Sequence, residues 1–507
     1  MRSNRCLTVL SVLGLAAGLA AGCAKTEAPA PAPAAEVKAP APTPPGGGKI
    51  PITTSSADAK AEYLQGRDMA ERLKITDSIA HFQKAASVDP HFALAEFQLA
   101  NTAPTGAEFF DHLHKAVVLA DGASDGEKLL ILATEAGANN DAVKQKDLLD
   151  KLVAAYPDDE RAQFAVAGFY FGQQDFLKAI DHYRKATEIA PDFSTAWNLL
   201  GYAYRQNGDF ASSERAFQKY IQLIPNEPNP YDSYAELLLK MGRFDDSIVQ
   251  YRKALGIDPN FVNAHQGIAM DLLYQGKSDA ALAELQTFLQ KARTDGERAT
   301  ALFARTVVHL DGGKTAKALD DADEQYALAE KGKNMPGMIG AVFLKGNILF
   351  DAGRFDEAGR QFERALKMVE DSSLSNEIKE NQRRLVHYNR ARVAAAKKDF
   401  ALAKTEAAEF RKGAEATRNP VQIKLANEIE GIVALAEKDD DKAIEALTQA
   451  NLQDPQNLFR LCTAYRGKND ASRALEFCGK AADFNSLPNL GYAFVRAKAK
   501  AAAEHKG

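Results

Sequence analysis

A residue pattern that returns about every 34 residues constrains the fold of this 507-residue chain more than any other feature. The clearest copy, residues 194–227, has large and small residues at fixed positions, namely Trp197, Leu200, Gly201, Tyr204, Phe217 and Pro225. Copies in the same register begin near residues 59, 90, 126, 160, 194, 228, 262, 299, 339, 384, 424 and 455. The starts from 126 to 262 are 34 residues apart, and the longer later steps predict lengthened helices or loops.

Each copy has the pattern of two antiparallel helices. A small residue such as Gly201 lets the helices approach closely, and large residues fill the remaining space between them. Gly208 and Asp209 supply a turn between the two halves, and Pro225 marks the point where the second helix must stop. One such pair cannot bury its apolar face alone, so the copies must stack. The pattern therefore predicts an all-α fold.

The spacing resembles the tetratricopeptide repeat, although the small-residue positions 20 and 27 of the clearest copy are Ser213 and Tyr220. The copies near 90, 262, 299 and 384 follow the pattern least well. The resemblance covers residues 59 to about 485 and implies an all-α superhelical solenoid. It divides the folded chain into three parts. The N-terminal block spans residues 59–295 and is regular from 126, and the C-terminal block, with longer and degenerate repeats, spans residues 296–485. A terminal helix or tail follows at 486–507.

The N-terminus has the features of an exported bacterial lipoprotein. Arg2 and Arg5 precede an apolar run of signal-peptide length, and residues 19–23, Leu-Ala-Ala-Gly-Cys, resemble a lipobox. The resemblance implies that residues 1–22 are cleaved as a signal peptide and that Cys23 is the lipid attachment site. Ala24 in place of aspartate favours the periplasmic face of the outer membrane. The alternative is an ordinary secretory signal cut at an A-x-A site.

A lipidated Ala/Pro-rich linker is predicted for residues 23–58. Eight of the twenty prolines lie between Pro29 and Pro51, and proline in alternation with alanine excludes a helix interior. Such a segment is expected to be extended polyproline II and to act as a semi-rigid spacer.

Composition and motifs argue against nucleic-acid binding and catalysis. The net charge is −5, and loss of the two signal-peptide arginines makes it −7, so bulk charge does not attract nucleic acid. His112 and His114 stand at i and i+2 and point away from each other on a helix. Residues 439–441, Asp-Asp-Asp, lack the glutamate of a calcium loop. We therefore expect no catalytic residues, no metal, no cofactor and no enzyme activity.

Cys462 and Cys478 are the cysteines that remain after the signal and the lipid site. They occupy positions 8 and 24 of their repeat, on the facing sides of its two helices. An oxidising compartment permits a disulfide there, worth about 3 kcal/mol in the chain-entropy model. The alternative is two small buried core residues with no bond.

The resemblance also implies which residues line a concave groove. The positions that face the groove in this family are occupied by Phe164, Phe171, Asn198, Tyr202, Arg205, Asp232, Glu236 and Gln266. Mixed aromatic and polar groups suit an extended peptide, and the alternative is a hydrated groove that binds nothing. The lysine and asparagine pattern of the co-chaperone carboxylate clamp is missing from the repeats that begin at 160, 194 and 228.

The sequence therefore predicts a non-catalytic, lipid-anchored scaffold that binds partner proteins or peptides of the cell envelope, in envelope assembly or secretion. Two other functions stay open. One is a structural envelope protein that associates with itself, and the other is an enzyme or glycan-binding protein whose site the sequence does not reveal.

Overall fold

A computed structural model gives the fold, and it describes residues 48–103, 106–139, 141–372, 374 and 376–504. The predicted signal peptide, Cys23 and residues 24–47 of the predicted linker lie outside the described residues. Within these residues the chain is built of α-helices with one short 3₁₀ turn, Ala120–Gly122, and has no strand. The all-α fold is confirmed.

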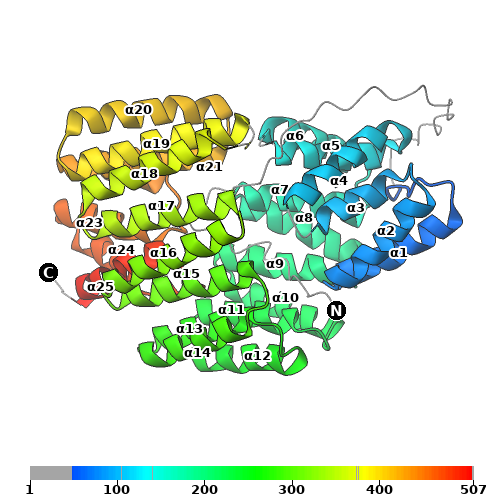
Figure 1. Ribbon diagram of the computed structural model, residues 1–507, viewed down its shortest axis with the longest axis horizontal. Coiled ribbons are helices and arrows are strands. Elements are labelled where there is room, and N and C mark those ends of the chain that lie inside the picture. Colours follow the sequence, from blue (N-terminus) through cyan, green and yellow to red (C-terminus); the bar gives the residue numbers. More distant parts are fainter. Residues whose placement is uncertain (1–47, 104–105, 140, 373, 375, 505–507) are drawn as a thin grey trace. The chain divides into compact units, whose positions relative to one another are not determined.

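The helices belong to two compact units, which are described separately, and the division falls between Pro225 and Asn226. In unit 1 the helices are α1 (Ala57–Glu71), α2 (Ile75–Val88), α3 (Ala93–Asn101), α4 (Gly106–Leu119), α5 (Asp125–Ala138), α6 (Ala142–Ala155), α7 (Glu160–Gly172), α8 (Phe176–Ile189), α9 (Ser194–Asn207) and α10 (Phe210–Leu223) (Figure 1).

In unit 2 they are α11 (Asn229–Lys240), α12 (Phe244–Ile257), α13 (Asn263–Tyr274), α14 (Ser278–Lys291), α15 (Asp295–Asp311), α16 (Thr315–Lys331), α17 (Met335–Asp351), α18 (Phe355–Glu370), α19 (Asn376–Ala396), α20 (Phe400–Thr417), α21 (Pro420–Glu437), α22 (Asp440–Thr448), α23 (Pro455–Gly467), α24 (Ala471–Ala482) and α25 (Leu490–Glu504).

Consecutive helices pack as pairs, and each pair packs on the next within its unit. The odd-numbered helices up to α23 are therefore the first helices of the repeats, and the even-numbered ones are the second helices. The first helices begin within a few residues of the positions expected from the sequence, except α19, which begins at Asn376 instead of near 384. Helices α15–α21 have 16–21 residues, which accounts for the longer later steps.

Aspartates at the helix starts explain much of this regular register. Asp175, Asp209, Asp399 and Asp439 each accept a hydrogen bond from a backbone N–H in the first turn of the helix that follows. An aspartate at this position satisfies a donor that has no partner within the helix. Gly208 ends α9 with φ +84°, a left-handed conformation that favours glycine.

Positions 8 and 24 of the repeat meet inside the helix pair. A Cβ atom added to Gly201 would come within 2.7 Å of the Phe217 ring, and Gly346 stands in the same relation to Phe362 at 2.6 Å. In the last repeat Cys462 and Cys478 take these two positions and form a disulfide with a Cα–Cα distance of 5.1 Å. That distance lies within the usual range for such a bond.

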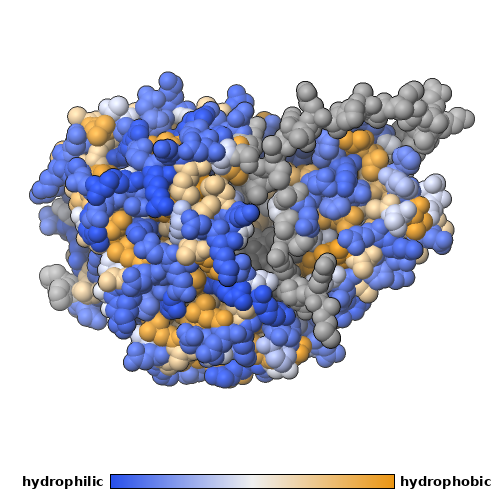
Figure 2. Space-filling model, viewed as in Figure 1, coloured by the Kyte–Doolittle hydropathy of each residue, from blue (hydrophilic) through white to orange (hydrophobic). Residues whose placement is uncertain are grey.

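The surface visible in Figure 2 is mostly hydrophilic, with hydrophobic residues gathered in small patches. None of the described helices combines the length and the apolar character needed to cross a bilayer.

Candidate functional site

In unit 1 an extended segment lies across the starts of α5 and α7 and the end of α2. This segment, residues 49–54, is called the strap below. The Ile50 N–H donates to Asp159 Oδ2 at 2.8 Å at the start of α7, and the Thr53 N–H donates to Glu127 Oε1 at 2.7 Å in the first turn of α5. The Thr54 hydroxyl donates to Asp89, which ends α2 just before α3. The helix array therefore holds the strap through side-chain carboxylates.

The two carboxylates that bind the strap backbone also cap their own helices. Asp159 Oδ1 accepts from the N–H groups of Arg161 and Ala162 at 2.8 and 2.9 Å, while Oδ2 faces the strap. Glu127 Oε2 accepts from the Ser124 N–H at 2.7 Å, as part of a capping box, while Oε1 faces the strap. Each carboxylate is fixed by its helix and presents its second oxygen to an extended segment.

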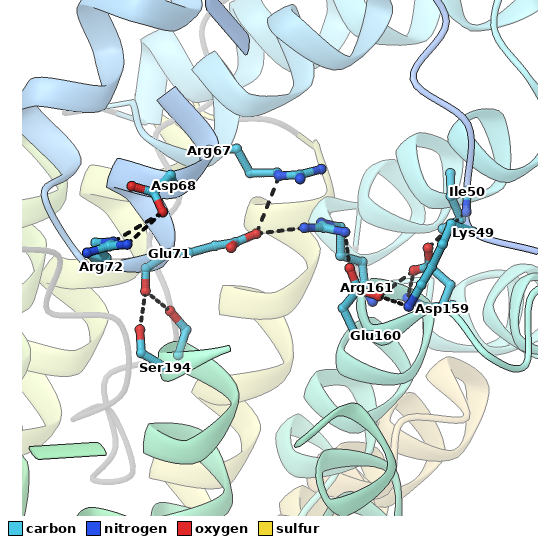
Figure 3. A network of polar contacts seen from close by, with 12 residues as sticks. Lys49, Ile50, Arg67, Asp68, Glu71, Arg72, Asp159, Glu160, Arg161 and Ser194 are labelled. Carbon is cyan, nitrogen blue, oxygen red and sulfur yellow. Dashed lines mark hydrogen bonds and ion pairs between the residues drawn. The ribbon is translucent and has the colours of Figure 1, made fainter. Parts of the chain in front are cut away.

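Charge also holds the strap to the start of α7 (Figure 3). Lys49 Nζ pairs with Glu160, whose side chain is 10% exposed. Burial alone would raise the pKa of Glu160, but the hydrogen bond from Lys49 and the charge of Arg161 outweigh it and lower the pKa below its ordinary value. Arg161 also pairs with Glu71 at 2.9 Å. A buried carboxylate next to the strap therefore has cationic partners on both sides.

The end of α1 reaches two later repeats in the same network. The Glu71 carbonyl oxygen accepts from the hydroxyls of Ser194 and Thr195 at 2.6 and 2.7 Å, and the Glu71 carboxylate pairs with Arg161 (Figure 3). Helix α1 is thus bonded to α7 and α9, more than eighty residues further along the chain.

Apolar side chains of the strap pack into the repeat cores. Ile50 packs on the cluster that contains Leu152 and Tyr156, and Ile52 packs on the cluster of Tyr63 and Phe82. Sequence reasoning missed the strap. The sequence Ser124-x-x-Glu127 is recognisable as a capping box, which marks Glu127 as a residue at a helix start. Nothing in the sequence indicates that the second carboxylate oxygen of Glu127 accepts a hydrogen bond from the Thr53 N–H.

The predicted groove residues of unit 1 lie mostly within the helix packing. Phe164 contacts the rings of Tyr183 and Phe193. Phe171, with 6% of its surface exposed, contacts Phe176. These two aromatic side chains stabilise the repeat cores, and their role in a groove stays a prediction.

Three further predicted groove residues lie on α9. Asn198 is buried, and its Oδ1 has no hydrogen-bond partner among the described residues. Tyr202 is also buried and packs edge-on against Phe217, and the Arg205 guanidinium lies 4.6 Å from the centre of its ring. The structure therefore brings Tyr202 and Arg205 together, both on the α9 helix.

The predicted groove residues of unit 2 are Asp232, Glu236 and Gln266. Asp232 and Glu236 stand one turn apart on α11, and burial together with the Glu236 charge raises the pKa of Asp232 well above its ordinary value. Gln266 is half-buried on α13.

A buried polar cluster joins later first helices of unit 2. Glu428 on α21 accepts from the Tyr388 hydroxyl at 2.7 Å and from Arg460 at 2.9 Å. Asp454 next to it has a pKa raised to about 6, because of its burial first and the Glu428 charge second. Arg392, which is 7% exposed, lies 4.5 Å from the Phe350 ring. This cluster connects α19, α21 and α23, and within it Arg392 Nε has no hydrogen-bond partner among the described residues.

The C-terminal helix α25 packs back on earlier repeats of unit 2. Arg496 pairs with Asp311, the last residue of α15, at 2.9 Å, and it also contacts the carbonyl oxygen of Tyr274 at the end of α13. The Tyr274 hydroxyl in turn donates to the Ser486 carbonyl at 2.6 Å. Segments of unit 2 that are 185 and 212 residues apart are thereby joined.

The residues considered for metal binding have structural partners. His112 Nδ1 is bonded to Glu96 at 2.6 Å, and Asp439 caps α22. No group of three potential metal ligands is present in the described part of the chain.

The side chain of Asp271 is buried, and neither of its carboxyl oxygens has a hydrogen-bond partner among the described residues. The Ser247 hydroxyl donates to the Ala235 carbonyl instead. Burial raises the pKa of Asp271 to about 8, with a smaller contribution from the charge of Asp245. The group is therefore protonated in the folded protein at neutral pH.

This carboxyl group predicts a loss of stability as pH rises. Between about pH 4, where the unfolded chain releases the proton, and about pH 8, the folded protein holds one more proton, so the free energy of unfolding falls by on the order of 1 kcal/mol per pH unit. Asp271→Asn removes this contribution. Urea unfolding at pH 5.5 and 8.5 should show a flatter pH dependence in the variant and higher stability than wild type at pH 8.5. Identical pH profiles would contradict the assignment.

Comparison with known families identifies the repeats. Profiles described as TPR repeat or tetratricopeptide repeat match residues 170–208, 194–227, 229–261, 267–334 and 343–410. Tetratricopeptide repeats are therefore present in both units, and the chain folds as an all-α solenoid. Repeats of this kind generally bind other proteins.

Solved structures give partial matches. Two are described as crystal structures of MamA, at 20% and 21% identity, and a third as MamA 41-end from Desulfovibrio magneticus RS-1, at 11%. They cover 33%, 31% and 33% of this chain and 91%, 93% and 94% of their own, with TM-scores of 0.30, 0.29 and 0.30. No curated protein gives a significant match.

Proposed function

We propose that this chain is a non-catalytic scaffold that binds partner proteins through its repeats and is held at a membrane by lipid on Cys23. The observation that supports binding is the strap, because the repeat array already holds an extended segment by its backbone N–H groups. The acceptors are fixed by helix caps, so binding orders the ligand without ordering the receptor, which lowers the entropic cost.

The proposed anchor agrees with the position of the strap. The strap begins at Lys49, so residues 24–48 separate it from Cys23. An extended Ala/Pro-rich segment of that length spans roughly 75 Å at about 3.1 Å per residue. Such a tether leaves the repeats free to meet partners away from the bilayer surface, which we place at the periplasmic face of the outer membrane.

The anchor is tested by Cys23→Ser. In a bacterium that processes lipoproteins, we expect the wild-type chain in the membrane fraction with the added mass of its acyl chains, and the variant in the soluble fraction without it. More than one acyl chain is needed for stable anchoring. Membrane association and intact mass that are the same in both proteins would contradict the lipid site.

Protein binding is tested with a photo-crosslinking residue at Gln266, on the first helix α13, and at Val249, on the second helix α12, as matched control. Val249 is 51% exposed. We expect crosslinks to defined proteins in envelope preparations from position 266 that are absent from position 249. Equal background from both positions would contradict binding at the first-helix face.

A further inference from the structure

We infer that the strap occupies a peptide-binding site of unit 1, and that the ligand of this site is an extended segment of a partner protein with lysine, a branched aliphatic residue, proline and a second aliphatic residue in succession. The strap sequence Lys49-Ile50-Pro51-Ile52-Thr53 is then an internal ligand that competes with the partner. This inference rests on the proposed scaffold function and names the class of ligand for it.

The acceptors of the site exist without the strap. With the strap bound, Asp159 and Glu127 are 1% and 0% exposed, and each uses one oxygen on its own helix start. Their second oxygens, Oδ2 and Oε1, are aimed at residues 50 and 53. If the strap leaves, these oxygens lose its two N–H donors, which water or the backbone of another extended segment must then replace. The site is therefore built to receive two backbone N–H groups.

The spacing of the two N–H groups defines the backbone shape of the ligand. A polyproline-II segment has three residues per turn, so the N–H groups of residues 50 and 53 point to the same side, about 9 Å apart. Pro51 between them favours this conformation and has no N–H to satisfy. A proline directly after the first bound residue is thus suited to the site.

Side chains define the rest of the ligand. Ile50 lies over Gly126 and Tyr156, where an added Cβ on Gly126 would meet the tyrosine ring at 2.7 Å and Ile50 Cγ2 at 3.1 Å. Lys49 neutralises Glu160. Buried carboxylates Glu127, Asp159 and Glu160 at the helix starts favour a cationic ligand and oppose an acidic one.

The strap is joined to α1 by residues 55 and 56, so its local concentration at the site is high. A partner segment must therefore displace it, which makes the strap a regulator of access. The linker contains a related sequence, Lys38-Ala39-Pro40-Ala41, with alanine in place of both isoleucines. This segment serves as a natural control peptide, because it lacks the apolar anchors.

The test is fluorescence anisotropy with a labelled peptide of residues 47–55 and a chain in which residues 49–54 are replaced by glycine and serine. We expect the peptide of residues 47–55 to bind saturably to the chain with the replaced strap. Its affinity for the chain with the intact strap should be at least about tenfold lower. The affinity of the peptide of residues 36–44 for the chain with the replaced strap should also be at least about tenfold lower. Circular dichroism confirms folding of each protein. Where the replaced strap does not fold, Ile50→Ser with Ile52→Ser keeps the strap and removes its anchors.

The site is located by Glu127→Gln with Asp159→Asn in the same background. Both amides still cap their helices, but they present an N–H₂ group to the ligand N–H groups, so affinity should fall about tenfold or more. Asp175→Asn, which changes an α8 cap away from the strap, is the matched control.

Two outcomes would overturn the inference. One is the absence of peptide binding to a folded protein without its strap, or equal binding to the amide variant. The other is a dimer in which the strap is donated by a second copy, detected by light scattering. Crosslinks from position 266 would in either case still support a scaffold, so the two proposals fail separately.

Discussion

Replacement of Arg496 by methionine lowers the free energy of unfolding of unit 2 by about 3–5 kcal/mol. Arg496 is 8% exposed and pairs with Asp311 at 2.9 Å. Without the guanidinium, the Asp311 carboxylate at the end of α15, which is 12% exposed, loses the cation that pairs with it, and a contact to the carbonyl oxygen of Tyr274 is lost. Urea unfolding followed by circular dichroism, with hydrogen exchange of residues 490–504, measures the effect.

Two controls separate the buried pair from general surface effects. Lys498 lies on the same helix as Arg496, and Lys498→Ala removes its ion pair with Asp351 at the end of α17. The lysine side chain is 57% exposed, so the free energy of unfolding should fall by less than about 1 kcal/mol. Arg496→Met combined with Asp311→Leu should recover part of the loss, because no charge is then left unpaired. A loss for Arg496→Met no larger than that for Lys498→Ala would contradict the role of α25.

Phe217→Ala lowers the free energy of unfolding of unit 1 by about 3–5 kcal/mol. The ring is fully buried, fills the space over Gly201 and packs edge-on against Tyr202 at 5.2 Å between ring centres. Removal leaves a cavity inside a repeat whose helices are held close by the glycine. The single tryptophan of the chain, Trp197, lies in unit 1, so its fluorescence during urea unfolding reports this loss.

Leu177→Ala is the control, because Leu177 is 65% exposed and its loss should change stability by less than about 0.5 kcal/mol. Gly201→Ala tests the same contact from the other side. Alanine favours helix by about 1 kcal/mol, but its Cβ would meet the Phe217 ring at 2.7 Å, so we expect net destabilisation. A stabilised Gly201→Ala variant would show that the helices are less tightly packed than described.

The repeat period made the fold predictable from the sequence. Positions such as Gly201 and Phe217 are local to one helix pair, and their contact follows from a spacing of sixteen residues that recurs at Gly346 and Phe362. The same spacing brings Cys462 and Cys478 together. Where packing repeats with the sequence, one sequence is enough to infer it.

Contacts that do not repeat could not be predicted in this way. The strap, the bonds from Glu71 to Ser194 and Thr195, and the pair of Arg496 with Asp311 do not recur along the array, and they join residues 35 to 185 positions apart. A quasi-one-dimensional array predicts contacts between neighbouring repeats only. The sequence predicts a terminal helix or tail at 486–507, but it does not predict the packing of this segment on α15.

The candidate site was only partly predictable. The groove positions were taken from the repeat family, and the structure places Phe171 and Tyr202 among buried aromatic side chains. The carboxylates that hold an extended segment, Glu127 and Asp159, look in the sequence like ordinary helix caps. Their second role depends on which segment reaches them in three dimensions.

Hydrogen exchange of the strap amides tests most directly whether helix-start carboxylates of unit 1 hold an extended segment. In the intact protein we expect the N–H groups of Ile50 and Thr53 to exchange much more slowly than in the free peptide of residues 47–55. Exchange should accelerate in Glu127→Gln with Asp159→Asn and stay slow in Asp175→Asn. Exchange of both amides at the free-peptide rate in the wild-type protein would contradict the account.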